Sequence, residues 1–233
     1  MAQYIHHEPC PSCGSRDNLA RYSDGGAFCY GCHYVERATH FVPKSNVKKE
    51  YEKIPRLSHE FSSECISWVQ QYDVSLEELL RRGCGWNDER KQLVFTFQDS
   101  DCWQARNFGA TKHGNNPRSK YYTQGDVNEL IPIYSTGRND GRLVVVEDCI
   151  SAIKVARHCD SMPVLGSHVS NGKLHRLSKL FHTIYFWLDA DKLKESRNAA
   201  DRARVIGINA HVIFTEDDPK CINDGDINVA IQT

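Results

Sequence analysis

The chain of 233 residues contains no apolar run that approaches the length of a membrane-spanning helix. Its first residues, MAQYIHHEPC, lack the basic and then apolar pattern of a secretory signal, so we expect a cytoplasmic protein without a membrane partner. Neither sign of charge is in excess, because the formal net charge is −1. This value gives no overall attraction to nucleic acid. It does not exclude nucleic-acid binding, since metal ions would cancel the charge of an acidic metal site.

The sequence also lacks an ATPase motor. The segment GSHVSNGKL, residues 166–174, resembles a phosphate-binding loop, but five residues separate its glycines where four are needed. Leu174 also stands where a Ser or Thr would have to reach Mg²⁺. The composition, with 40% hydrophobic and 25% charged residues, is that of a soluble protein with one large domain or a few small ones.

Ten cysteines are present, and in a cytosolic chain they indicate metal ligands before disulfides. Cys10 and Cys13 form one C-x-x-C pair, Cys29 and Cys32 form another, and fifteen residues lie between the pairs. Each pair aims two thiolates at one point, so together they predict one closed, structural Zn²⁺ site. The double spacing disfavours the alternative of four buried core cysteines. The other cysteines have no paired spacing and are predicted to be small buried residues: Cys65, Cys84, Cys102, Cys149, Cys159 and Cys221.

A closed metal site stabilises the local fold and does not take part in a reaction, so the residues around it are candidates for binding rather than for catalysis. His6, His7 and His33 lie near the cysteines, but four thiolates already fill the coordination shell, so we expect these rings at the surface or facing DNA. Arg16 and Arg21 suit contacts with phosphates, and nearby tyrosines suit base stacking. Zinc ribbons also bind proteins, so this argument alone leaves the partner open.

Residues 41–57 contain two prolines and dense charge, and they are predicted to be a linker. The following segment predicts two short helices that end at Gly83, then a strand QLVFTFQD and a partner strand CWQARNF.

Four basic residues and no acidic residue lie between Cys102 and Thr123: Arg106, Lys112, Arg118 and Lys120. One interpretation is an exposed polar loop with its lysines in solvent. The other is a positive surface that binds the phosphates of a nucleotide or of a nucleic-acid strand.

From Arg142 onward, segments typical of strands alternate with segments typical of helices. Strands are predicted at residues 143–147, 162–166, 183–189 and 210–215. Helices are predicted at residues 148–159, 170–181 and 192–206, with Asp148 as the N-cap of the first. This alternation predicts a parallel sheet with helices on both faces, and such sheets bind ligands at the carboxyl ends of their strands.

Three acids stand where predicted strands end: Glu147, Asp189 and Asp191. Asp189 and Asp191 are two residues apart, so in an extended strand their side chains leave the same face. Like charges held so close repel one another unless a cation lies between them. If the two strands are neighbours, the three carboxylates predict a Mg²⁺ site, since hard oxygen ligands suit Mg²⁺ better than zinc. The alternative is that the two aspartates only cap the following helix.

A glutamate that ends one strand and an Asp-x-Asp that ends another, in a small parallel α/β domain, resemble the Toprim fold of DnaG-type primases, topoisomerases and some nucleases. With a four-cysteine ribbon in front and a basic region between, the order resembles a phage DNA primase, similar to the primase half of phage primase–helicases. The resemblance covers nearly the whole chain. It implies a zinc ribbon for template recognition at residues 1–40, a linker at 41–57, a basic α+β part of the RNA polymerase domain at 58–135, and a Toprim metal-binding catalytic domain at 136–233.

The resemblance also implies roles for single residues. Glu147, Asp189 and Asp191 match the family's catalytic, metal-binding acids, and Lys120 in RSKYYTQG matches a lysine that contacts nucleotide phosphate. The residues expected to bind nucleotide or DNA are Arg106, Arg118, Lys120 and Lys192 in the core, with Arg16 and Arg21 in the ribbon.

In the segment DINVAI, Asp226 resembles a further metal-side aspartate, and Asp224 is an alternative. One departure is Ser151, which stands where many family members carry a second acid. A second metal would then be held more loosely, or by Asp226 and nucleotide phosphates alone.

The implied function is synthesis of short RNA primers from ribonucleoside triphosphates on a single-stranded DNA template. This nucleotidyl transfer would depend on one or two Mg²⁺ ions, with Mn²⁺ as a possible substitute. The chain has no helicase half, so a separate replicative helicase is an expected partner unless the chain is a fragment of a longer protein. A phage-encoded primase would work in the cytoplasm of the infected host cell.

Two other functions remain as alternatives. A Toprim nuclease would use the same carboxylates, but the ribbon and the basic region would then have no evident role. A non-catalytic recombination mediator also combines a zinc site with a Toprim domain and binds DNA. In that family the zinc site lies almost directly against the Toprim domain, whereas here over a hundred residues separate Cys32 from Glu147.

Overall fold

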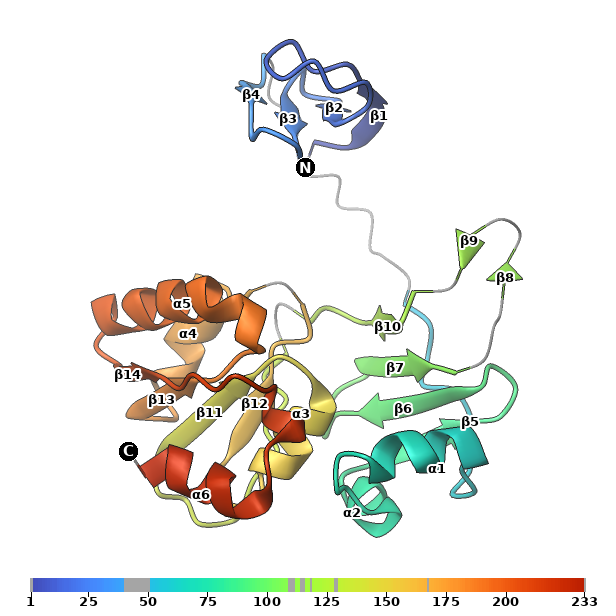
Figure 1. The fold of residues 1–233 in the computed structure, drawn as a ribbon, viewed down its shortest axis with the longest axis vertical. Helices are drawn as coiled ribbons and strands as arrows, with labels where there is room; N and C mark the ends of the chain where they lie inside the picture. The colour runs from blue at the N-terminus through green and yellow to red at the C-terminus, as the bar shows by residue number, and fades with distance from the viewer. Residues whose placement is uncertain are drawn as a thin grey trace. The chain divides into compact units, whose positions relative to one another are not determined.

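The computed structural model describes residues 2–39, 51–108, 119–127, 130–166 and 168–232, and the backbone of two short strands at 112–113 and 116–117. The chain divides into two compact units, residues 1–50 and residues 51–233 (Figure 1). Arg118 and residues 41–50 of the predicted linker lie outside the described residues. No helix in the described part of the chain is long and apolar enough to cross a membrane.

The first unit is a small antiparallel sheet in the order β1-β2-β3-β4. Its strands are β1 (Tyr4–Glu8), β2 (Leu19–Tyr22), β3 (Ala27–Cys29) and β4 (Val35–Glu36). In the turn after β2, Gly25 has a φ of +78°, a conformation that favours glycine, and Asp24 Oδ1 accepts a hydrogen bond from Gly26 N at 3.0 Å. This tight turn returns β3 along β2 and sets Cys29 opposite Leu19.

The second unit begins with two short helices, α1 (Ser63–Gln70) and α2 (Leu76–Arg81). A serine caps each of them: Ser62 Oγ accepts from Cys65 N at 3.2 Å, and Ser75 Oγ accepts from Glu78 N at 3.1 Å. The helices occupy the segment in which two short helices were predicted.

An antiparallel sheet in the order β10-β7-β6-β5 follows these helices. Its strands are β5 (Cys84–Asn87), β6 (Gln92–Thr96), β7 (Trp103–Asn107) and β10 (Tyr121–Gln124). Between β7 and β10 in the chain, two short strands pair with each other: β8 (Lys112–His113) and β9 (Asn116–Pro117). The pairing of β6 with β7 is as predicted. The sequence did not predict β5 and β10, because CGWN and YYTQ are short and do not alternate apolar with polar residues.

The C-terminal part forms the predicted parallel sheet, in the order β12-β11-β13-β14. The strands β11 (Arg142–Val146) and β13 (Thr183–Phe186) are neighbours in the centre, and β12 (Ser161–Pro163) and β14 (Asn209–Val212) lie at the edges. Helices α3 (Cys149–Val155) and α6 (Asp224–Gln232) cover one face, and α4 (Asn171–Leu177) and α5 (Leu193–Val205) cover the other (Figure 1). The 3₁₀ helices η1 (Ala190–Lys192) and η2 (Pro219–Cys221) follow β13 and β14. The predicted fold class, a mixed α/β chain with a cysteine ribbon and a parallel sheet, is confirmed.

Alternate residues of β11 enter two different cores, as the two-residue period of a strand requires. Leu143 and Val145 pack in the core beneath α4 and α5. Val144 and Val146 pack in the core beneath α3 and α6, and this second core continues into the antiparallel sheet, where it includes Trp86. The two sheets of the second unit therefore share one core.

Residues 51–57, the end of the predicted linker, pack on the antiparallel sheet. Trp103 Nε1 donates to the Glu52 carbonyl at 3.0 Å, and the Glu52 carboxylate lies 2.6 Å from Arg90 Nη1 and 3.2 Å from Tyr122 Oη. This stretch is therefore part of the folded second unit.

Among the cysteines outside the tetrad, five are buried as predicted, but the prediction for Cys221 is wrong. It lies at the end of η2, where the turn after β14 exposes its side chain.

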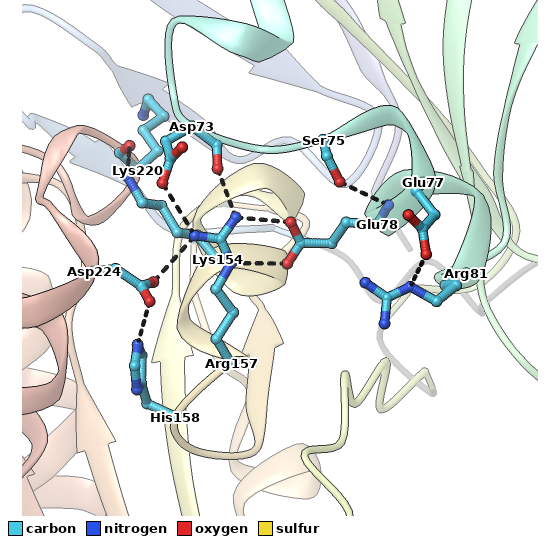
Figure 2. A network of polar contacts seen from close by, with 10 residues as sticks. All are labelled: Asp73, Ser75, Glu77, Glu78, Arg81, Lys154, Arg157, His158, Lys220 and Asp224. Carbon is cyan, nitrogen blue, oxygen red and sulfur yellow. Dashed lines mark hydrogen bonds and ion pairs between the residues drawn. The ribbon is translucent and has the colours of Figure 1, made fainter.

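Arg157, which follows α3, joins three parts of the second unit (Figure 2). Its guanidinium forms a bidentate pair with Glu78 of α2, at 2.9 and 2.7 Å, and Nη1 lies 3.1 Å from Asp224 Oδ1 of α6. Nη1 also lies 3.3 Å from Asp73 Oδ2. The side chains of Arg157 and Glu78 are only 23% and 10% exposed, so this pair is screened little by solvent.

We expect Arg157→Ala to lower the free energy of unfolding of the second unit by about 3 kcal/mol, because it leaves the Glu78 carboxylate buried without a cation. Urea unfolding followed by tryptophan fluorescence measures this loss. The matched control is Arg81→Ala, since Arg81 lies 3.8 Å from Glu77 in a pair whose side chains are 69% and 84% exposed. The control should cost less than about 0.5 kcal/mol, and equal losses in the two variants would contradict the assignment.

Candidate functional site

The four cysteines predicted to bind zinc lie together. The sulfur atoms of Cys10, Cys13, Cys29 and Cys32 are all within 4.8 Å of one another, and the four are free thiols. Contacts run between the two C-x-x-C pairs: Cys10 Sγ is 3.7 Å from Cys32 Sγ, and Cys13 Sγ is 3.8 Å from Cys29 Sγ. This closed tetrad of sulfur ligands suits Zn²⁺ in a structural role.

The thiols of the tetrad differ in how readily they ionise. Hydrogen bonds from the side chain and backbone of Ser15 lower the pKa of Cys13 to about 6. Burial raises the pKa of Cys10 to about 11. Because a metal ion binds the thiolate form, metal binding would release a proton from Cys10 at neutral pH.

The two arginines of the ribbon have different surroundings. Arg16 is exposed. Arg21 Nε donates to Glu8 Oε1 at 3.0 Å, and the same guanidinium forms an ion pair with Glu36. Hydrogen bonds to these carboxylates, first Glu36 and then Glu8, raise the pKa of Arg21. Its charge is therefore balanced within the sheet, and contact of either arginine with DNA stays a prediction.

Carboxylates gather where the parallel strands end. Because β11 and β13 are neighbours, Glu147 and Asp189 follow adjacent strands of the sheet, and Asp218 follows β14 on the other side of β13. Asp148 caps α3 as predicted, since its Oδ1 accepts from Ser151 N at 3.0 Å. We call this group the acidic edge: Glu147, Asp148, Asp189, Asp191 and Asp218.

Lys220 of η2 points its ammonium group into the acidic edge. Its Nζ lies 2.9 Å from Asp148 Oδ2, 3.3 Å from Asp189 Oδ2 and 2.9 Å from Asp218 Oδ2. Burial disfavours the charge on Lys220, but the attraction of the carboxylates, Asp148 first, outweighs it and raises the pKa. Lys220 and Asp218 were not predicted as site residues. Asp218 could have been found, since it is an acid three residues after the strand predicted at residues 210–215, but no pattern in the sequence points to Lys220.

Asp189 is the most perturbed acid of this edge. Burial raises its pKa to about 7; Lys220 opposes the shift, and the like charge of Glu147 adds to it. Its Oδ1 is shielded from solvent and has no hydrogen-bond partner among the described residues. No side-chain capping bond is made by Asp189 at the start of η1 or by Lys192 at the start of α5. Helix capping therefore does not account for Asp189.

The remaining members of the edge lie nearer to solvent. Glu147 is partly buried; burial raises its pKa, and the charge of Lys192 opposes the rise. The Asp191 side chain is 74% exposed, with its Oδ2 3.3 Å from Lys192 Nζ. The positive charge of Lys192 thus offsets the negative charges of Glu147 and Asp191. The charge of Lys220 offsets those of Asp148, Asp189 and Asp218.

The acidic edge is not closed around a metal position. In the part of the chain that the structure describes, the cysteine tetrad is the one group of three or more His, Cys, Asp or Glu side chains whose ligand atoms lie within 4.8 Å of one another. Even so, the donor atoms of the edge are carboxylate oxygens, and Oδ1 of Asp189 is buried without a partner. Such a donor set fits a hard divalent cation such as Mg²⁺.

The two acids of α6 have structural partners. Asp224 lies 3.1 Å from Arg157 Nη1 and 3.2 Å from His158 Nε2 (Figure 2). Asp226 N donates to Asn223 Oδ1 at 3.0 Å, and Asn223 Nδ2 donates to the Asp226 carboxylate, a reciprocal cap of the helix. Asp224 is therefore committed to Arg157, and a metal role for Asp226 stays a prediction.

The predicted basic residues that the structure describes with side chains lie around Tyr121 of β10. The Arg106 Cζ lies 5.4 Å and the Lys120 Nζ 5.7 Å from the centroid of the Tyr121 ring. Arg106 also lies over Trp68, at 4.7 Å, and over Phe108, at 5.8 Å. The basic residues are therefore arranged on aromatic rings and are not a loop of free lysines.

Two nitrogen atoms of Arg106, Nε and Nη1, are shielded from solvent and have no hydrogen-bond partner among the described residues. Burying a cation without a partner is unfavourable, so this guanidinium is suited to an anionic ligand. The acidic edge is close by: burial raises the pKa of Tyr121, and the negative charge of Asp148 raises it further. The charges of Asp148 and Arg106 thus both act on Tyr121, and the two sheets are in contact next to these residues, since Cys149 Sγ donates to Gln104 Oε1 at 3.6 Å.

Comparisons with known proteins bear on the fold. No protein-family model matches the sequence, and no curated protein matches it. The Aquifex aeolicus primase, with its zinc-binding and RNA polymerase domains, is similar over 100% of this chain and 80% of its own, with a TM-score of 0.61 and 11% identity. A DnaG primase catalytic domain bound to ssDNA is similar over 73% of this chain and 71% of its own, with a TM-score of 0.57 and 13% identity. The E. coli primase catalytic core has a TM-score of 0.56 and 14% identity over the same shares. At these identities the likeness shows the fold alone, a cysteine ribbon followed by an antiparallel and a parallel sheet.

We expect removal of the metal from the cysteine tetrad to unfold the first unit, because the core of this unit is small and includes two of the ligands, Cys10 and Cys29. Cys29→Ser should abolish zinc retention and the hydrogen-exchange protection of β2 and β3, while β11 and β13 keep theirs. Zinc analysis and exchange mass spectrometry measure these effects. The control Cys221→Ser, which alters an exposed thiol outside the tetrad, should retain full zinc content. If the Cys29→Ser protein kept its full zinc content, the assignment of the cysteine tetrad as the zinc site would be wrong.

Proposed function

We propose that the chain is a DNA primase, a nucleotidyltransferase that synthesises short RNA primers on single-stranded DNA. The observation that carries the proposal is the meeting of the acidic edge with Arg106 and Lys120 around Tyr121. Phosphoryl transfer needs both kinds of group at one place, carboxylates for a divalent ion and cations for the triphosphate. The likeness in fold to primases, one of them bound to ssDNA, supports the choice among enzymes that use such a site.

Glu147, Asp189 and Asp191 would hold the Mg²⁺, with Mn²⁺ as a substitute. When bound, the ion would neutralise charge on the leaving pyrophosphate and lower the pKa of the attacking primer hydroxyl. The partnerless Oδ1 of Asp189 would gain a cation, which would offset the cost of its burial.

Arg106, Arg118 and Lys120 would orient the triphosphate, and Lys192 would contact nucleotide or DNA near the same edge. Because the aromatic rings around Arg106 fix its guanidinium, little conformational entropy would be lost when it binds a phosphate. Positioning and charge stabilisation would supply most of the rate.

We assign residues 1–40 to a zinc ribbon that contacts the template, in part through Arg16 and Arg21. Of the linker predicted at residues 41–57, we assign only residues 41–50 to a linker, since residues 51–57 belong to the folded second unit. Residues 58–135 form the basic part of the polymerase domain, and residues 136–233 form its Toprim part. The partners would be a single-stranded DNA template, ribonucleoside triphosphates and a separate replicative helicase.

A primer-synthesis assay with single-stranded DNA, labelled ribonucleotides and Mg²⁺ tests the function. We expect short labelled oligoribonucleotides from the wild type. Asp189→Ala should lower their yield by about 100-fold or more, because the charge stabilisation that a catalytic metal supplies is worth several kcal/mol. DNA binding, measured by fluorescence anisotropy, should change little, since Asp189 contacts the ion and not the template.

The matched control is Asp201→Asn, which removes an exposed carboxylate of α5 that pairs with Arg204 at 2.8 Å, and it should synthesise primers at the wild-type rate. Shortening of the DNA without primer formation would favour a nuclease. Binding without either reaction, even with a helicase added, would indicate a DNA-binding module. Full activity in Asp189→Ala would overturn the metal assignment.

A further inference from the structure

The cations at the acidic edge divide its carboxylates into two groups. Lys220 contacts Asp148, Asp218 and Oδ2 of Asp189. Lys192 acts on Glu147 and contacts Asp191. Asp189 is only partly held by Lys220, because its Oδ2 contacts the ammonium, whereas its Oδ1 has no partner among the described residues. The like charge of Glu147, a member of the other group, also acts on Asp189.

The two lysines differ in how firmly they are held. The Lys220 side chain is 14% exposed, and its ammonium group, which has three hydrogens, contacts three carboxylates. Its backbone carbonyl accepts a hydrogen bond from the buried Lys154 Nζ at 3.1 Å, which fixes η2 against α3. The Lys192 side chain is 40% exposed and pairs with one carboxylate that is itself exposed. An incoming cation would therefore displace Lys192 easily and Lys220 only at a high cost.

The geometry points to Lys220 as a built-in replacement for a second metal ion, so that the acidic edge binds a single divalent ion, on the side of Glu147, Asp191 and Oδ1 of Asp189. This inference rests on the proposed metal-dependent function and defines how many ions that function uses. It also gives a physical reason for Ser151. With the ammonium of Lys220 already beside Asp148, a further acid on α3 would have no cation to bind, and the Ser151 Oγ instead donates to Asp148 Oδ2 at 3.2 Å.

The test is Mn²⁺ binding to the full chain with its zinc in place, followed by electron paramagnetic resonance. We expect the wild type to bind one Mn²⁺ at the edge, with no spin coupling between metal ions at saturation. In Lys220→Met the carboxylates that held the ammonium become free, so a second Mn²⁺ should bind and coupling should appear. Lys220→Arg keeps the charge and should bind one ion.

The matched control is Lys194→Met, which removes the same charge from an exposed position on α5. This variant should bind one Mn²⁺ ion, as the wild type does. Thermal unfolding supplies a second measurement. Without added divalent ion and with the zinc retained, Lys220→Met should melt below the wild type, because three acids lose their counter-ion, and Mn²⁺ should restore more stability to it than to the wild type.

Two coupled Mn²⁺ ions in the wild type would overturn the inference, and this measurement does not depend on any variant folding. An unchanged count in folded Lys220→Met would also overturn it. These results are independent of primer synthesis. A wild type that makes primers with two bound ions refutes only the role of Lys220, whereas one bound ion, with the expected gain in Lys220→Met but no primers, refutes the proposed function and keeps the role of Lys220.

Discussion

Mutual repulsion among the carboxylates of the acidic edge is the constraint on which the arrangement of the second unit depends. Parallel strands deliver their carboxyl ends to one edge of a sheet, and here three of the four strands are followed there by acids. Like charges about 4 Å apart repel by about 4 kcal/mol in a partly screened protein environment. Cations must offset this repulsion, and each neighbouring element brings one: Lys220 from η2, Lys192 from η1, and Arg106 and Lys120 at the side of Tyr121.

The same need explains the choice of residue at position 106. A guanidinium is more weakly hydrated than an ammonium and stacks on aromatic faces, so it can be partly buried among Trp68, Phe108 and Tyr121 without losing its charge. A lysine at this position would lose the stacking and would be desolvated at a greater cost. The rings therefore hold a cation whose Nε and Nη1 are shielded from water.

Local patterns in the sequence predict much of this structure. The C-x-x-C pairs and the apolar runs of β11 and β13 depend on short-range spacing, and they lie where expected. The predicted same-face geometry of Asp189 and Asp191 is wrong, because β13 ends at Phe186 and Asp191 lies in the 3₁₀ helix η1. The contacts of Lys220 with Asp148 and of Arg157 with Glu78 could not be predicted, because these partners are 72 and 79 residues apart and meet only when the whole unit has folded. The ring contact of Arg106 with Trp68 also joins separate elements, since Arg106 belongs to β7 and Trp68 to α1. Charged pairs of this kind follow no sequence period.

The core that the two sheets of the second unit share has a consequence for ligand binding. Trp86 of the antiparallel sheet, Val144 of the parallel sheet and Ile227 of α6 belong to one apolar cluster, so neither sheet can open without exposing part of the other. Such a unit unfolds cooperatively, and any molecule that binds only the folded form stabilises all of it. A nucleotide or metal ion at the acidic edge would thus raise the free energy of the cooperative unfolding that exposes α1, although it touches no residue there.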